Sequence, residues 1–141
     1  MVDPLPEDAP FFVKDYYDYY KTPRGYHKRS LNSNKGWAAS AGTSLMNTKL
    51  LAFADDIESA VLVIHGEKAH SRYFSEGAFE KMTGKKANVP AKLDATKNWS
   101  KTVGNKELLI LPGAVHTDLY DDVNGRIPYD KMEEFFKANL K

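Results

Sequence analysis

Two uninterrupted apolar runs constrain the fold of this chain more than any other feature of its sequence. Residues 60–64 read AVLVI and residues 108–111 read LLIL, and each run stops at a turn, His65-Gly66 in the first case and Pro112-Gly113 in the second. A strand without polar alternation carries apolar side chains on both faces, which is typical of parallel strands covered by helices on both sides. The pattern therefore predicts an α/β protein with two buried parallel strands.

Helical periodicity surrounds these runs. It predicts a helix over residues 75–83, capped by its first serine and ended by Gly84, and a last helix over residues 128–140. Residues 85–105 are polar and rich in lysine, so they are interpreted as a surface excursion with one short helical turn. The order strand, helix, strand implies parallel pairing through a right-handed crossover.

The N-terminal part has a different character. Residues 1–58 are rich in aromatic side chains, and Pro10 is placed to open a helix that ends at Thr22-Pro23. An irregular loop follows, and a second helix is predicted over residues 43–53. The chain therefore divides into a helical segment, residues 1–58, and an α/β part, residues 59–141.

The predicted sheet is too small to be stable by itself. Two parallel strands that are apolar on both faces would leave their edges exposed, and no other segment has a clear strand pattern. The sequence therefore predicts one half of a larger sheet. The N-terminal half of the same fold, or a second chain, would complete it, and a dimer through the exposed edges is an alternative.

Composition excludes several classes of function. The 20 basic and 19 acidic side chains nearly cancel, so a generic nucleic-acid-binding face is not expected. The cluster of Arg24, His27, Lys28 and Arg29 leaves open an anion or an RNA base as a ligand. Cysteine is absent, and no apolar stretch approaches the roughly 20 residues of a membrane span. With no signal-peptide pattern at the N-terminus, we expect a cytoplasmic protein without membrane partners.

The strongest chemical signal is a histidine that follows the second apolar run. Residues 111–118 read LPGAVHTD, which places His116 just beyond the C-terminal end of the predicted strand. Ligands and catalytic groups gather at that edge of open α/β sheets. Histidine is also the side chain best suited to move protons near neutral pH. His116 is therefore a candidate general base, although a loop histidine without a chemical role has the same pattern.

A second loop follows the first apolar run. Residues 63–72 read VIHGEKAHSR, and neighbouring parallel strands would bring this loop beside the one that carries His116. A carboxylate here could then orient the imidazole. His65 is expected to pack at the strand end, while His70 and Arg72 either face a pocket or lie in solvent. The histidines lack a zinc-ligand spacing, so we expect neither a metal nor a cofactor.

Four stretches of the sequence carry a family resemblance. They are TPRGYHKRS at residues 22–30, NSNKGW at 32–37, HGEKAHSRYFSE at 65–76 and PGAVHTDLY at 112–120. In combination they resemble the C-terminal half of an α/β-hydrolase, nearest to bacterial members of the dienelactone-hydrolase and fermentation–respiration-switch groups. The likeness extends over residues 10–140.

The resemblance implies a role for several residues. His116 matches the family's catalytic histidine, the base that activates the nucleophile. The family's acid usually stands three residues after the glycine of the earlier loop, a position held here by Ala69. Glu67 is the nearest carboxylate and Glu76 the next, and both stay open as the acid.

The aromatic N-terminal segment would correspond to the family's helical cap. Residues 1–58 would then supply side chains that line the entrance for the substrate. The candidate substrate-binding residues are Tyr26 and Trp37 in this segment, together with His70 and Arg72 in the later loop.

One departure from the family pattern is decisive for the expected activity. The nucleophile of α/β-hydrolases sits in a Gly-x-Ser-x-Gly elbow, or its cysteine variant, between a strand and a helix. Residues 41–44 (AGTS) lack the flanking glycines and the preceding apolar strand, and the rest of the chain has no such elbow. The oxyanion hole, which depends on the elbow, is missing with it.

Two hypotheses follow from this pattern. In the first, the chain supplies His116 and the cap to an esterase-like hydrolase of small ester-like molecules and is inactive alone. In the second, the chain is a non-catalytic binding or assembly module that keeps part of the hydrolase fold.

Overall fold

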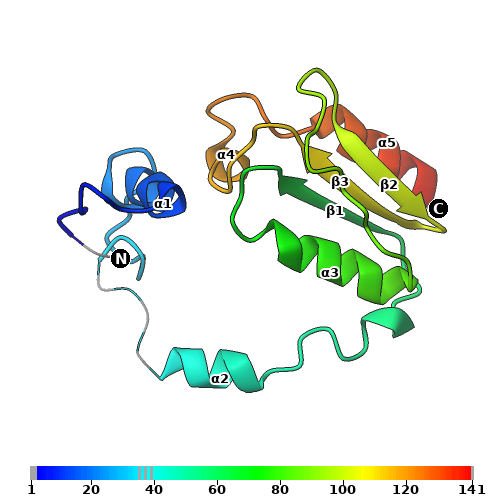
Figure 1. Cartoon of the computed structure of the whole chain (residues 1–141), viewed down its shortest axis with the longest axis horizontal. Helices are drawn as coiled ribbons and strands as arrows, with labels where there is room; N and C mark the ends of the chain where they lie inside the picture. Colours follow the sequence, from blue (N-terminus) through cyan, green and yellow to red (C-terminus); the bar gives the residue numbers. More distant parts are fainter. Residues whose placement is uncertain (1–2, 35, 37, 39, 141) are drawn as a thin grey trace. The chain divides into compact units, whose positions relative to one another are not determined.

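The computed structural model of the chain describes residues 3–34, 36, 38 and 40–140. Its elements follow in the order α1 (Phe11–Lys21), α2 (Ala41–Asn47), η1 (Ala54–Asp56), β1 (Val61–Gly66), α3 (Arg72–Thr83), β2 (Trp99–Val103), β3 (Lys106–Leu111), α4 (Asp118–Asp121) and α5 (Tyr129–Asn139) (Figure 1). They form two compact units, Met1–Leu50 and Leu51–Lys141, which are described separately below. The boundary predicted at Glu58 falls within the second unit.

A three-stranded mixed sheet forms the centre of the second unit, with the strand order β1-β3-β2. β1 and β3 are parallel, as predicted, and their register pairs Val63 with Leu108 and Gly66 with Leu111. Every residue of β3 is buried, whereas the apolar residues of β1 are half-buried. The part of the chain that the structure describes therefore leaves β1 at one edge of the sheet.

The third strand, β2, corrects the prediction of a surface excursion over residues 85–105. β2 pairs antiparallel with β3 through a tight turn at Gly104 and Asn105. Its burial alternates from residue to residue, with Trp99 and Val103 packed on the sheet core and Ser100 exposed. This alternation is typical of an antiparallel edge strand with one solvated face. The sheet is therefore mixed, and the purely parallel sheet of the prediction is not what the chain forms.

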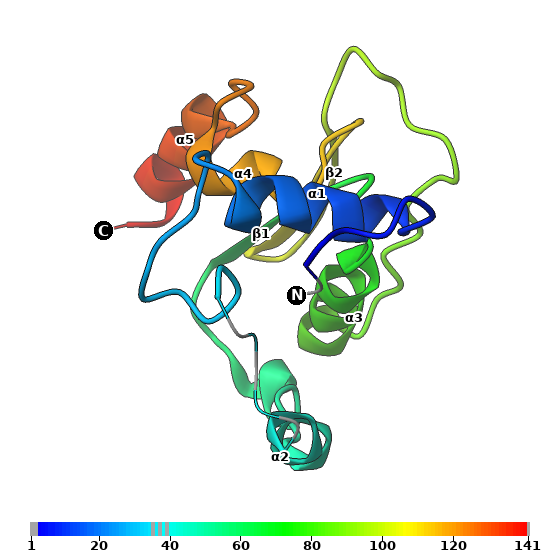
Figure 2. The same cartoon turned by 90° about the vertical axis from the view of Figure 1, so that its left-hand side faces the viewer.

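Helices cover both faces of the sheet. Alternate residues of β3 point to opposite faces, so Leu108 and Ile110 pack with Phe79 of α3. On the other face, Leu109 and Leu111 pack with Ala114 and with Leu119 of α4, and α5 joins this side through an ion pair with β3. Figures 1 and 2 show α3 and α5 on opposite sides of the sheet.

The predicted helices of this unit exist, with one corrected boundary. The N-cap of α3 is Ser71 and not Ser75, which lies one turn inside the helix. The chain makes only a short turn after β1, so the helix starts earlier than its apolar face suggests. The predicted end of this helix is confirmed because Gly84 adopts the left-handed conformation, with φ of 63°. Pro128 is the N-cap of α5, close to its predicted start.

The first unit contains α1 and α2. The helix predicted to open at Pro10 is confirmed as α1, and Pro10 is its N-cap. α2 begins two residues before the helix predicted over residues 43–53 and ends at Asn47, because Thr48 is extended. Among the helices that the described residues form, none is long and apolar enough to span a membrane.

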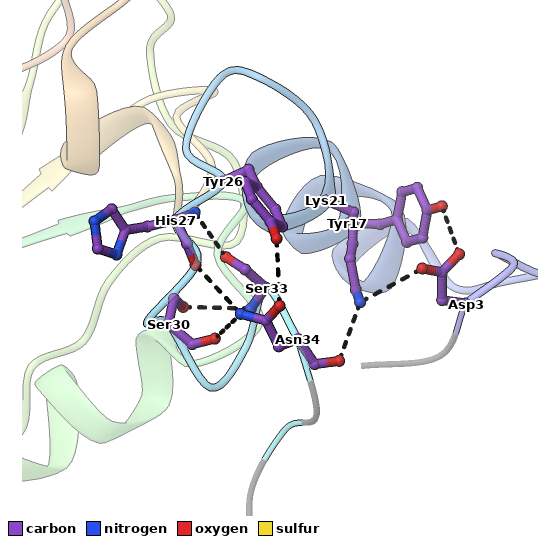
Figure 3. A network of polar contacts seen from close by, with 8 residues as sticks. All are labelled: Asp3, Tyr17, Lys21, Tyr26, His27, Ser30, Ser33 and Asn34. Atoms are coloured by element: carbon purple, nitrogen blue, oxygen red, sulfur yellow. Dashed lines mark hydrogen bonds and ion pairs between the residues drawn. The ribbon is translucent and has the colours of Figure 1, made fainter.

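The loop after α1 is irregular, as predicted, but it is tied together by one side chain. The amide of Asn34 donates to the backbone carbonyls of His27 at 3.3 Å and Ser30 at 2.8 Å, and its oxygen accepts from the Tyr26 hydroxyl at 3.3 Å (Figure 3). The same amide also donates to the carbonyl of Lys28 at 3.0 Å. A flexible linker would not be expected to contain such a set of hydrogen bonds around one side chain. The network gives residues 26–34 a defined shape.

Candidate functional site

The loop that follows β3 carries His116. It turns at Pro112-Gly113, where Gly113 has φ of 70°, and continues through the buried Ala114. The carboxylate of Asp118, itself buried, accepts the Val115 N–H at 2.9 Å and the Asn124 amide at 2.9 Å. The bond from Val115 to Asp118 closes the turn around His116, and the bond from Asn124 holds the Asp118 side chain, so the imidazole projects from a hydrogen-bonded turn.

The loop that follows β1 lies directly against this turn, as the sequence predicts. The N–H of Glu67 donates to Leu111 O at 2.9 Å, and the N–H of Lys68 donates to Ala114 O at 2.8 Å. A Cβ added at Gly66 would overlap the carbonyl group of Ala114 and would lie 2.8 Å from its carbon. Only glycine therefore allows the two loops to approach this closely.

A chain of hydrogen bonds joins the two loops at the level of the histidines. The hydroxyl of Ser71 lies 3.0 Å from Nδ1 of His116 and 3.2 Å from Nε2 of His65. The hydroxyl of Ser75 lies 2.8 Å from Nδ1 of His65. The two imidazole centroids are 5.8 Å apart. The site therefore contains two imidazoles and two hydroxyls in alternation, supplied by the end of β1, the loop after β3 and the N-terminal end of α3.

Burial governs the protonation of His65. Loss of solvent, together with the positive charges that His116, Arg72 and His70 can carry, lowers its pKa to about 4. At neutral pH His65 is therefore uncharged and holds a single ring proton. An uncharged imidazole donates one hydrogen bond and accepts one, and the hydroxyls of Ser71 and Ser75 can each fill either role.

The two carboxylates that the sequence leaves open as the catalytic acid have other partners in the structure. Glu67 Oε2 accepts the N–H of Gly113 at 2.7 Å, so this side chain braces the turn that leads to His116. Glu76 Oε1 accepts from Nε of Arg72 at 2.7 Å. The hydroxyl on Nδ1 of His116 belongs to Ser71. The acid role of Glu67 and Glu76 stays a prediction.

The structure brings some of the candidate substrate-binding residues to the site. His70 is exposed, with its ring centroid 6.4 Å from that of His116, and the Tyr120 ring stands edge-on to His116 at 5.3 Å. Arg72 is half-buried and also donates to the Glu67 carbonyl at 3.3 Å, so its guanidinium mainly ties the loop together.

Two candidates belong to the other unit. The hydroxyl of Tyr26 donates to Asn34, and the ring is half exposed. Trp37 lies outside the described residues. The substrate-binding role of both stays a prediction.

Sequence reasoning missed three residues that shape the site. They are Ser71 and Ser75, which hold the imidazoles, and Asp118, which closes the turn. A usable signal existed for the serines, because positions four apart lie on one face of a helix, and these two stand at the start of the helix that follows β1. Within the described part of the chain, no group of three or more histidine, aspartate or glutamate side chains could hold a metal ion.

Comparison with known proteins gives a relative without an assigned activity. No family model matches the chain. Over 130 residues, 92% of this chain, it is 42% identical to the uncharacterized protein PA2218 of Pseudomonas aeruginosa, of which it spans 29%. The crystal structure of hypothetical protein PA2218 from the same organism matches 96% of this chain with a TM-score of 0.74 and 41% identity, and 36% of that chain is covered. This chain thus spans about a third of the length of the protein that it resembles.

Proposed function

We propose that this chain is part of an α/β-hydrolase in which His116 is the general base for hydrolysis of a small ester-like substrate. The observation that carries the proposal is the placement of His116 at the C-terminal end of β3, with its Nδ1 hydrogen-bonded to a group from the neighbouring parallel strand's loop. A general base of this kind is held through one ring nitrogen and works through the other. His116 has that arrangement at Nδ1.

The geometry of the two loops supports the same reading. A base must be held in one orientation to take a proton from a nucleophile that it meets at about 3 Å. The bonds that join Glu67 and Lys68 to the turn, and the close approach at Gly66, give His116 such a rigid support. A loop histidine without a chemical role would not need it.

In this proposal, the nucleophile and the oxyanion hole come from a further segment of polypeptide that pairs with the edge of β1 and completes the sheet. The apolar residues of β1 are half-buried at a sheet edge, whereas β3 is buried on both faces. The relative PA2218 is about three times as long as the part matched by this chain. The remaining length of such a protein is enough to supply further strands to the sheet. A further segment of the same protein, or a second chain, would pair with β1 and present a serine or cysteine nucleophile to His116.

A hybrid protein tests this proposal. In the hybrid, the matched 130 residues of PA2218 are replaced by the corresponding residues of this chain. We expect the hybrid to release nitrophenol from p-nitrophenyl acetate or butyrate with saturation kinetics, and the chain alone to give only the buffer rate. A hybrid that is folded by circular dichroism yet inactive on both esters would contradict the proposal. The ester hydrolysis of PA2218 itself is measured in parallel as the control.

The alternative of a non-catalytic assembly module has one observation in its favour. The group on Nδ1 of His116 is a neutral hydroxyl, whereas the Ser-His-Asp arrangement places there a carboxylate that stabilises the imidazolium formed in catalysis. Such a module would assemble through the edge of β1. An inactive hybrid together with a dimer of this chain in sedimentation equilibrium would favour this alternative, and a stable monomer would count against it.

A further inference from the structure

We infer that Ser71 takes the place of the catalytic carboxylate and is the positioning residue for His116, with His65 and Ser75 as the groups that hold Ser71 in turn. This inference rests on the proposed function, in which His116 is the base. It assigns to the site an uncharged relay of two hydroxyls and one imidazole. Its evidence is the set of three hydrogen bonds of 3.0, 3.2 and 2.8 Å that joins the four side chains.

The direction of these bonds follows from what a base must do. When His116 has taken a proton at Nε2, both of its ring nitrogens carry hydrogen, so the Ser71 oxygen can only accept from Nδ1. The Ser71 proton must then point to Nε2 of His65, and the one ring proton of His65 lies on Nδ1, directed to Ser75. This arrangement fits the neutral and the protonated form of His116 alike, whereas the reverse direction fits only the neutral form.

His65 keeps the relay neutral throughout the reaction. Burial and the nearby charges of His116, Arg72 and His70 disfavour its protonation, so Nε2 of His65 stays an acceptor. The proton taken from the nucleophile therefore stays on Nε2 of His116, from where it passes to the leaving group. No charge moves beyond Ser71.

Ser71 could instead be a nucleophile, because a serine within hydrogen-bond distance of a histidine has that appearance. The structure argues against this role. Its oxygen sits between two imidazoles and is half-buried, and its proton is directed to His65 when it accepts from His116. Its contact with His116 is through Nδ1, the nitrogen that takes the orienting partner in the Ser-His-Asp arrangement.

The test uses the tautomer of His116 in this chain, measured by long-range ¹H–¹⁵N NMR of the imidazole rings. The wild-type chain should show His116 with its proton on Nδ1. Ser71→Ala should shift the ring toward the Nε2–H form that free imidazole side chains prefer, and Ser71→Thr, which keeps a hydroxyl, should restore the Nδ1–H form. Ser100→Ala removes an exposed serine of β2 and should change nothing.

The variants are expected to fold. Ser71 is the N-cap of α3 but makes no side-chain capping bond, so Ser71→Ala removes none. Ser71→Gly, a residue well tolerated at N-caps, is a second variant without the hydroxyl. Ser75→Ala should weaken the preference of His116 for the Nδ1–H form less than Ser71→Ala does, because Ser75 reaches His116 only through His65 and Ser71.

Two results would overturn the inference. One is an unchanged His116 tautomer in Ser71→Ala and Ser71→Gly. The other is covalent labelling of Ser71 by a fluorophosphonate probe in the chain alone, which would make it a nucleophile. These measurements need neither substrate nor partner, so their failure is distinguishable from failure of the proposed function. In an active hybrid, loss of the Ser71 hydroxyl should lower kcat by about tenfold, the size of one hydrogen bond, with KM unchanged.

Discussion

Gly66 is the position at which the two loops of the site come closest. Replacing Gly66 by alanine places a methyl group against the Ala114 carbonyl, and the backbone of both loops must move. We expect Gly66→Ala to lower the free energy of unfolding by about 1–3 kcal/mol, the usual cost of overpacking. Urea unfolding followed by circular dichroism measures this change.

Gly77 offers the matched control in α3. A Cβ there meets nothing within 4 Å, so Gly77→Ala should raise the free energy of unfolding by about 0.5–1 kcal/mol through helix propensity. A Gly66→Ala variant as stable as the wild type would contradict the close approach of Gly66 to the Ala114 carbonyl.

The pH dependence of stability should report the buried His65. Its pKa is about 4 in the folded chain and near 6.5 when unfolded, so the unfolded state binds more protons between these values. The free energy of unfolding should therefore fall as the pH is lowered from about 6.5 toward 4. Denaturant midpoints measured across this range should show the slope, and His65→Gln should flatten it. An equal slope in the variant would contradict the assignment.

The sequence predicts which loops form the site, but not the contact between Ser71 and His116. Histidines and glycines directly after apolar runs are visible in the sequence, and parallel strands bring such ends together. The contact itself spans 45 positions and depends on the register that pairs Gly66 with Leu111. Strands that are apolar on both faces do not specify their register by alternation, so this contact could not be derived.

A half-buried ion pair links α5 to β3. Nζ of Lys131 lies 3.1 Å from the carboxylate of Glu107, which is buried in β3. Lys131→Met leaves that carboxylate without its partner and should lower the free energy of unfolding by about 1–3 kcal/mol. Urea unfolding is the measurement.

An exposed pair in the same helix provides the comparison. Lys137→Met removes the ion pair with Glu133, both of whose side chains are exposed, and should cost less than about 0.5 kcal/mol. Equal effects of the two variants would mean that the half-buried pair between Lys131 and Glu107 does not fasten α5 to β3.

The elements themselves were predictable in proportion to their apolar patterns. β1, β3, α1, α3 and α5 have strong patterns and clear turn residues, and all were expected close to where they lie. β2 was missed because Ser100, Lys101 and Thr102 hide a weak alternation that only the partner strand β3 makes stable. The four-residue α4 is too short to have a periodic signal.

At the scale of the whole molecule, the exposed edge of β1 has a measurable consequence. In this chain alone, hydrogen exchange should be faster for the β1 amides than for those of the buried central strand β3. In the hybrid, strand pairing at the edge should slow β1 to a rate near that of β3. Protection of β1 equal to β3 in a chain shown to be monomeric by sedimentation would contradict an incomplete sheet.

The proposal that His116 is the general base is tested most directly by the effect of His116→Ala on kcat/KM for p-nitrophenyl ester hydrolysis by the hybrid. A general base contributes about 100- to 10,000-fold, so we expect His116→Ala to lower kcat/KM at least about a hundredfold. Ser100→Ala, which removes an exposed serine of β2 outside the site, should leave kcat/KM unchanged. A hybrid that hydrolyses the ester equally well without His116 would show that His116 is not the general base.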